Sequence, residues 1–178
     1  MRVPARAVSL IVASLCLAAP AVASAECAGT DLRPSAENLP EVRSAVLCLL
    51  NQQRASRGLR KLRANAKLRR AAQRYSENMN ANNFFAHVSP TGTTPVERVK
   101  AAGYLTGARS WAVGENIAWG EQRLSTPGEI MQSWMESPGH KANILNRRFR
   151  HVGIGVVLGA PMSGADGATY TTAFGKRA

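Results

Sequence analysis

Two stretches in the first half of the chain repeat apolar residues every three or four positions, which is the spacing of one helix face. The first stretch consists of Val42, Ala45, Val46, Leu49 and Leu50. The second consists of Leu68, Ala71, Ala72, Tyr75 and Met79. Gly58 suits the end of the first helix, and Asn65 can cap the start of the second. The sequence therefore predicts two amphipathic helices joined by a short connection.

Three proline-containing turns predict the starts of shorter helices. The segments TPVE (94–97) and TPGE (126–129) each offer a capping threonine, a proline at the first helical position and a glutamate at the third. SPGH, from residue 137, restarts a helix that reaches about residue 145. We expect one short helix after residue 94 and two more between residues 126 and 145.

Strict alternation of apolar and other residues marks the predicted strands. It runs through 152–158, and after a turn at PMSGADG (161–167) a returning strand is expected over 169–175. A third alternating stretch is WAVGENIAWG, residues 111–120. Helices grouped around hairpin-connected strands favour an α+β domain with an antiparallel sheet.

Glu115 stands in the apolar register of the 111–120 strand, whose expected apolar face consists of Trp111, Val113, Ile117 and Trp119. An isolated ionised carboxylate is too costly to bury, so it must be paired, hydrogen-bonded, metal-bound or protonated. Two interpretations remain open: either the strand bulges at Gly114, or Glu115 has a buried partner.

The first 25 residues are typical of a secretory signal. Arg2 and Arg6 precede the apolar run 8–19, and small residues at 23–25 suit cleavage before Glu26. We therefore expect a secreted or periplasmic protein whose mature chain, 26–178, forms one domain. No later stretch reaches transmembrane length. We expect a monomer.

Cys27 and Cys48 are the only cysteines after residue 25. In an exported chain such a pair favours a disulfide, here tying an N-terminal arm to the first helix, with two free thiols as the alternative.

Positive charge dominates the chain, with a formal net charge of +12, or +10 after Arg2 and Arg6 are removed. Nine basic residues between 54 and 74 have no acidic residue among them. Such a face can bind anionic lipid or cell-envelope polymer, or it can simply keep the protein soluble. Because the chain is exported, nucleic acid is not an expected partner.

Several segments resemble the bacterial branch of the CAP superfamily, which includes the cysteine-rich secretory proteins, antigen 5 and the plant pathogenesis-related proteins. They are CLLNQQRASRGL, HVSP, VGENIAWG, SWMESPGHKANILNRRFRHVGIGV and YTTAFGK. The resemblance covers about residues 42–176. It implies a three-layer α-β-α sandwich of the CAP/SCP type over residues 42–178, with residues 26–41 as the arm.

The resemblance also implies a central cavity, which family members line with two histidines and two glutamates and which can hold zinc or another divalent cation. Carried over, the cavity residues are His87, Glu115, Glu136 and His140, and the expected metal ligands are His87, Glu115 and His140. Glu136 follows Trp134 by two residues rather than the family's three. A second family histidine has no counterpart, and His151 could compensate only if it faced inward, whereas its register faces away. The helix-start position of His140 favours the neutral imidazole that binds metal.

Two functions fit this chemistry. The first is a cavity-bearing binding module for lipid or cell-envelope ligands. The second is a metal-assisted hydrolase, peptidase-like, with Glu115 as the base. Because few groups could stabilise an oxyanion and no serine-nucleophile motif is present, we favour the binding module over an enzyme.

Overall fold

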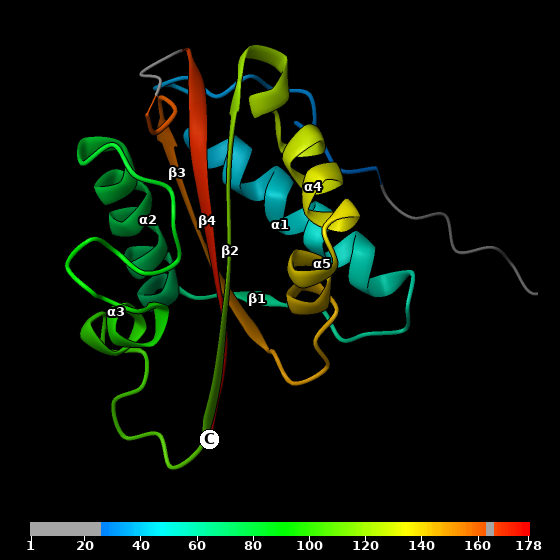
Figure 1. The fold of residues 1–178 in the computed structure, drawn as a ribbon. Coiled ribbons are helices and arrows are strands. Elements are labelled where there is room, and N and C mark those ends of the chain that lie inside the picture. The colour runs from blue at the N-terminus through cyan, green and yellow to red at the C-terminus, as the bar shows by residue number, and fades with distance from the viewer. Residues whose placement is uncertain (1–25, 163–165) are drawn as a thin grey trace, which may run out of the picture.

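The structure, a computed structural model, describes residues 26–162 and 166–178. The predicted signal (1–25) and part of the predicted 161–167 turn lie outside the described residues. A sheet lies between two helical layers (Figure 1). One layer contains α1 (Leu39–Ala55), α4 (Pro127–Glu136) and α5 (Pro138–Ile144), and the other contains α2 (Ala66–Ala81) and α3 (Pro95–Ala101). The predicted α-β-α sandwich is confirmed.

The sheet has the strand order β1-β3-β4-β2. Its strands are β1 (Arg63–Ala64), β2 (Trp111–Glu121), β3 (His151–Leu158) and β4 (Gly167–Arg177), and a short 3-10 helix, η1 (Gln122–Ser125), follows β2. The three long strands are antiparallel, as predicted, whereas β1 pairs parallel with β3. A two-residue strand in a basic segment has no alternation, so the pattern did not predict β1.

The pairing of β2 with β4 runs without interruption from Trp111 to Glu121, so β2 does not bulge at Gly114. Glu115 is 8% exposed and therefore needs a buried partner. The expected apolar face holds only in the middle of the strand, because Trp111 and Trp119 are 45% and 40% exposed. Helical layers cover both faces of the middle of β2, so burial depends more on position along this strand than on face.

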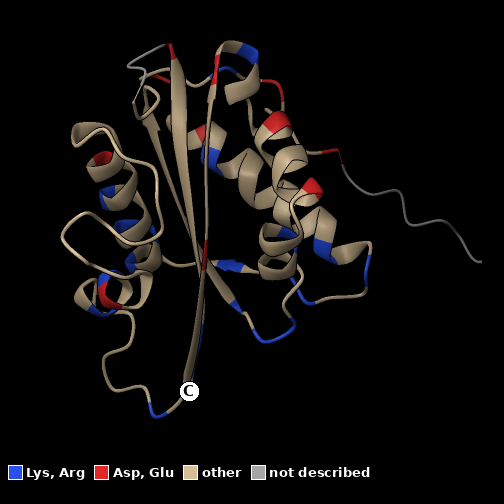
Figure 2. Cartoon of the chain, in the orientation of Figure 1, with Lys and Arg blue, Asp and Glu red and all other residues tan. Residues whose placement is uncertain are grey.

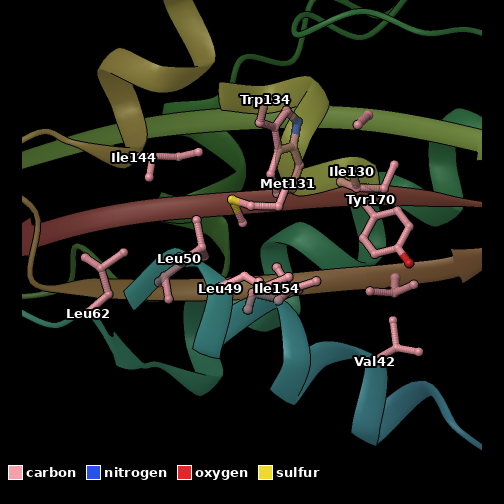
Figure 3. Packing of buried hydrophobic residues seen from close by; sticks show 14 of the residues in the cluster. Val42, Leu49, Leu50, Leu62, Ile130, Met131, Trp134, Ile144, Ile154 and Tyr170 are labelled. Carbon is pink, nitrogen blue, oxygen red and sulfur yellow. The ribbon is translucent and has the colours of Figure 1, made fainter. Parts of the chain in front are cut away.

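The main core lies between the sheet and the helices α1 and α4 (Figure 3). Val42, Leu50 and Trp134 are fully buried there. Each large apolar side chain of this kind contributes roughly 1.5–3 kcal/mol when buried. The predicted inner faces of the first two helices are both buried, since α2 packs on the opposite face of the sheet through Leu68 and Met79.

The predicted helix caps are present. Thr94 and Glu97 form a complete capping box at α3, and the Asn65 side chain accepts hydrogen bonds from two backbone N–H groups of α2. Thr126 caps α4 through the N–H of Glu129, whereas Ser137 makes no capping hydrogen bond at α5. Short polar signals in the sequence thus fix where most of these helices begin.

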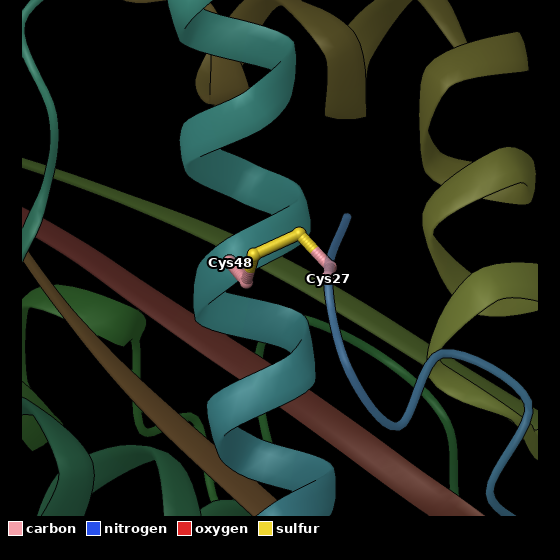
Figure 4. Close-up of a disulfide and its surroundings, with 2 residues drawn as sticks. All are labelled: Cys27 and Cys48. Atoms are coloured by element: carbon pink, nitrogen blue, oxygen red, sulfur yellow. A yellow bond between two sulfur atoms is a disulfide. The ribbon is translucent and has the colours of Figure 1, made fainter. Parts of the chain in front are cut away.

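Cys27 and Cys48 form the predicted disulfide, with a Cα–Cα distance of 5.7 Å (Figure 4). It ties the segment before α1 to the middle of that helix. The helix itself begins at Leu39, within the 26–41 segment assigned to the arm. In the described residues no helix is both long enough and apolar enough to cross a membrane.

Candidate functional site

Glu115 lies at the centre of a buried ion-paired cluster. Its Oε1 accepts hydrogen bonds from Nδ1 of His87 and from Nη2 of Arg98, both at 2.9 Å. Its Oε2 accepts from the same Arg98 nitrogen at 2.7 Å. The Glu115 side chain is 5% exposed and that of Arg98 is 10% exposed. Arg98 therefore supplies the buried partner that the apolar register of Glu115 requires.

Arg98 is held in place by groups from three parts of the chain. Its Nη1 donates to the Thr93 carbonyl at 2.8 Å, and its Nη2 donates to the His87 carbonyl at 3.0 Å. The guanidinium carbon lies 3.2 Å from the centre of the Tyr75 ring, a cation–π contact. Since the capping box fixes the start of α3, the helix presents Arg98 to Glu115 in one defined geometry.

His87 lies in the loop between α2 and α3, and its side chain is about half exposed. An ionised carboxylate can only accept hydrogen bonds, so the Nδ1 atom that contacts Glu115 carries the hydrogen. In the neutral imidazole this leaves Nε2 as the acceptor. His87 thus joins the buried cluster to the surface.

His140 lies in α5, and its carbonyl accepts a hydrogen bond from the Asn116 side chain at 3.1 Å. Its Nδ1 is buried and has no hydrogen-bond partner within the described residues. Burial, and then the nearby charge of His87, lower the pKa of His140. The neutral form predicted from the sequence is therefore favoured, and burial is its first cause.

The backbone of Glu115 and its neighbours Gly114 and Asn116 position α5 against the outer edge of β2. Asn143 donates to the Glu115 carbonyl at 3.0 Å and to Oδ1 of Asn116 at 2.9 Å. A Cβ at Gly114 would lie 2.7 Å from the Phe149 ring, so only glycine leaves room there. Gly114 thus leaves room for the Phe149 ring, and Glu115 and Asn116 each accept a hydrogen bond from Asn143. Asn143 was not among the predicted site residues.

Glu136 and His151, two residues considered for the cavity, do not join the cluster around Glu115. Glu136 is exposed at the end of α4, accepts a hydrogen bond from Gln132 at 2.9 Å and lines a hollow between α1 and α4. His151 begins β3, and its Nδ1 is 2.8 Å from the hydroxyl of Tyr104. The structure does not bring either residue into hydrogen-bond contact with Glu115. For Glu136, the sequence indicated this placement through its spacing, since it follows Trp134 by two residues rather than the family's three.

The described residues do not fit a metal centre built on Glu115. No group of three or more His, Cys, Asp or Glu side chains that could hold a metal ion occurs in 26–162 or 166–178. Both oxygens of Glu115 already bind the Arg98 cation, which stands close to where a cation would have to bind this carboxylate. Zinc binding at this site stays a prediction, which titration of the protein with zinc tests.

The sequence model of CAP, the cysteine-rich secretory protein family, matches residues 47–172. The chain belongs to this family. Its CAP domain contains every residue of the cluster, and only the Cys27 end of the disulfide lies outside the matched range.

Relatives of this CAP domain occur in Bacillus subtilis (strain 168). The uncharacterized protein YkwD is 40% identical over 114 residues, 63% of this chain and 41% of that protein. The uncharacterized membrane protein YlbC is 32% identical over 111 residues, 62% of this chain and 30% of that protein. The matched region thus spans less than half the length of these two relatives.

Solved structures show the same fold. An outer surface protein from Borrelia burgdorferi superposes with a TM-score of 0.66 at 20% identity, covering 83% of this chain and all of the other. An extracellular protein containing an SCP domain from Bacillus anthracis str. Ames gives a TM-score of 0.59 at 27% identity, covering 76% of this chain and 43% of the other.

Sequence reasoning missed two arginines. Arg98 follows Glu97 in a short helix, and no local signal connects it with a carboxylate 17 residues later. Arg54 belongs to the basic 54–74 stretch that was read as one continuous face, yet it is completely buried. The structure therefore corrects that interpretation for Arg54.

Proposed function

We propose that this CAP domain is an extracellular binding module for a lipid or cell-envelope ligand, secreted or periplasmic, and not a hydrolase. Membership of the CAP family supports an extracellular role, as do structural relatives described as extracellular and outer surface proteins. The signal-like segment 1–25 points the same way.

One observation carries the proposal: the carboxylate of Glu115 is ion-paired with Arg98 and buried away from solvent. A general base needs a free lone pair within reach of water or substrate. Here Arg98 binds both oxygens, His87 binds one of them, and the side chain is 5% exposed. Such a carboxylate holds the loop and α3 on the sheet, which suits a rigid recognition surface.

Metal-assisted hydrolysis remains the second candidate, and one observation favours it. The buried Nδ1 of His140 has no partner in the described part of the chain, and the lowered pKa of His140 favours the neutral imidazole, the form that binds a metal. A serine-type hydrolase would instead need a side-chain nucleophile. The hydroxyl of Ser89 is buried in its own turn, where it contacts Thr91 and accepts from the N–H of Thr93.

The test incubates the protein with purified cell-envelope fragments and, separately, with generic peptide and ester substrates, each with and without zinc. We expect the protein to sediment with the fragments and to release no soluble amino groups, reducing ends or acids. Isothermal titration with zinc, on protein prepared without chelator or affinity tag, should show no binding at Glu115. Hydrolysis that requires zinc and disappears in Glu115→Gln would overturn the proposal in favour of the enzyme.

A further inference from the structure

A cationic hollow lies beside β1, at the edge of the sheet. It has a volume of about 830 Å³, and Arg60, Lys61, Arg63 and Arg150 line it. We call it the basic hollow. Its described lining contains no acidic residue. Figure 2 shows blue segments gathered around β1 and the loop before β3.

The walls of the basic hollow are held by a buried cation. Arg54 is fully buried, and its guanidinium donates to the carbonyls of Arg60, Ile144 and Asn146 at 2.9, 2.7 and 3.0 Å. It thereby joins the 56–62 loop to the 145–150 loop, the two segments that carry most of the cations. Asn51 adds two hydrogen bonds to the backbone of Leu62. The cationic side chains thus project from a fixed frame, which lowers the ordering cost of binding.

The buried arginine also raises the positive potential of this region. Its partners in the described residues are carbonyl groups, and no acidic side chain forms an ion pair with it. Burial and, after it, the like charge of Arg150 lower the pKa of Arg54. An anion in the basic hollow would contact its cationic side chains directly, and it would also reduce the repulsion between Arg54 and Arg150.

A second hollow adjoins the first across β1. It has a volume of about 450 Å³, and Arg43 of α1 and Arg69 of α2 lie among its lining residues. We call it the edge hollow. Arg63 lines the basic hollow and the next residue, Ala64, lines the edge hollow, so the two are separated by about one residue of β1. Six cations therefore line two neighbouring hollows rather than a single pocket.

The side chains that line the two hollows favour a polyanionic chain over a bilayer or a nucleic acid. A bilayer is bound by apolar side chains that protrude beside the charges, whereas the exposed large apolar residues, such as Phe85 and Trp111, lie outside both hollows. Single-stranded nucleic acids stack their bases on aromatic rings. Phe, Tyr and Trp are all missing from the described lining.

We propose that the basic hollow and the edge hollow together bind a linear polyanion of the cell envelope, a polymer that carries repeated phosphate or carboxylate groups. Arginine forks bind both groups through paired N–H donors. This inference rests on the proposed binding role and names its ligand class and its site, which is separate from the Glu115 cluster.

The experiment measures binding of the full mature chain to polyphosphate and to polygalacturonate at several salt concentrations. The test variant is Arg60→Gln/Lys61→Gln/Arg63→Gln. The control is Arg70→Gln/Lys100→Gln/Arg109→Gln, which removes the same charge from exposed residues outside both hollows. We expect the test variant to bind at least tenfold more weakly, and the slope of log K against log salt to fall by about 2, as the loss of three contacts predicts. The control should change affinity less than threefold.

Several results would overturn the inference. They are an equal loss in the control variant, no binding of either polymer at low salt, equally tight binding of inorganic phosphate alone, or stronger binding to phosphatidylglycerol vesicles than to the polymers. Circular dichroism verifies that the test variant folds; if it does not, Arg43→Gln/Arg69→Gln in the edge hollow replaces it, with the same expected loss. Hydrolysis in the earlier assay would contradict the proposed function without affecting this result.

Discussion

Replacing Arg98 by methionine tests whether the Arg98–Glu115 pair is what permits a carboxylate inside this domain. Methionine keeps an unbranched apolar stem against Tyr75 but removes the charge and the hydrogen bonds to Glu115, Thr93 and the His87 carbonyl. Glu115 would keep one side-chain donor, His87.

The expected cost follows from burial. Removing one partner of a buried ion pair destabilises a protein by about 3–5 kcal/mol, because the other charge stays buried without compensation. The half-exposed His87 still contacts Glu115, so we expect a loss near the lower limit, about 3 kcal/mol. In a domain of this size that corresponds to a melting temperature lower by roughly 6–12 °C.

Urea denaturation of the single and double variants measures this loss. The double variant Arg98→Met/Glu115→Leu removes both charges and should be more stable than the sum of the single losses predicts, by about 2 kcal/mol. Arg123→Met is the matched control, because the ion pair of Arg123 with Glu129 is exposed and its removal should cost less than about 1 kcal/mol. A loss in Arg98→Met no larger than in the control, or additive losses in the double variant, would refute the argument.

Three further predictions test the fold and the neutral histidine. Replacing Cys27 and Cys48 by serine should lower the free energy of unfolding by about 3 kcal/mol, the value for a loop of this length, as urea denaturation checks. Gly155→Ala places a Cβ 2.4 Å from the backbone of α2 and should cost roughly 1–3 kcal/mol, whereas Gly139→Ala, which meets nothing within 4 Å, should cost nothing. Because the folded state lowers the pKa of His140, the unfolded state binds a proton more readily, so stability should fall as the pH drops below about 6.5. His140→Asn should flatten that slope in denaturation curves between pH 7.5 and 5; an unchanged slope would contradict the assignment.

Much of the secondary structure could be predicted from the sequence because its signals are local. The capping box at Thr94 and the cap at Asn65 lie within four residues of the groups they bind. The alternation in 152–158 is likewise a property of neighbouring residues, and it became β3. The same reasoning required a buried partner for Glu115, because the cost of burying a charge does not depend on which fold surrounds it.

The identity of that partner was decided only by the tertiary structure. Arg98 reaches Glu115 because α3 packs beside β2, and nothing in the segment TPVERV distinguishes this arginine from an exposed one. The same holds for Arg54, whose carbonyl partners lie as far as 95 residues away, and for Glu136, which lies on α4 beside a different hollow. Local patterns were enough to predict the longer helices and strands, and to require that a buried charge be compensated. Which side chains meet was decided by packing, because a contact between distant segments depends on how both elements lie on the sheet.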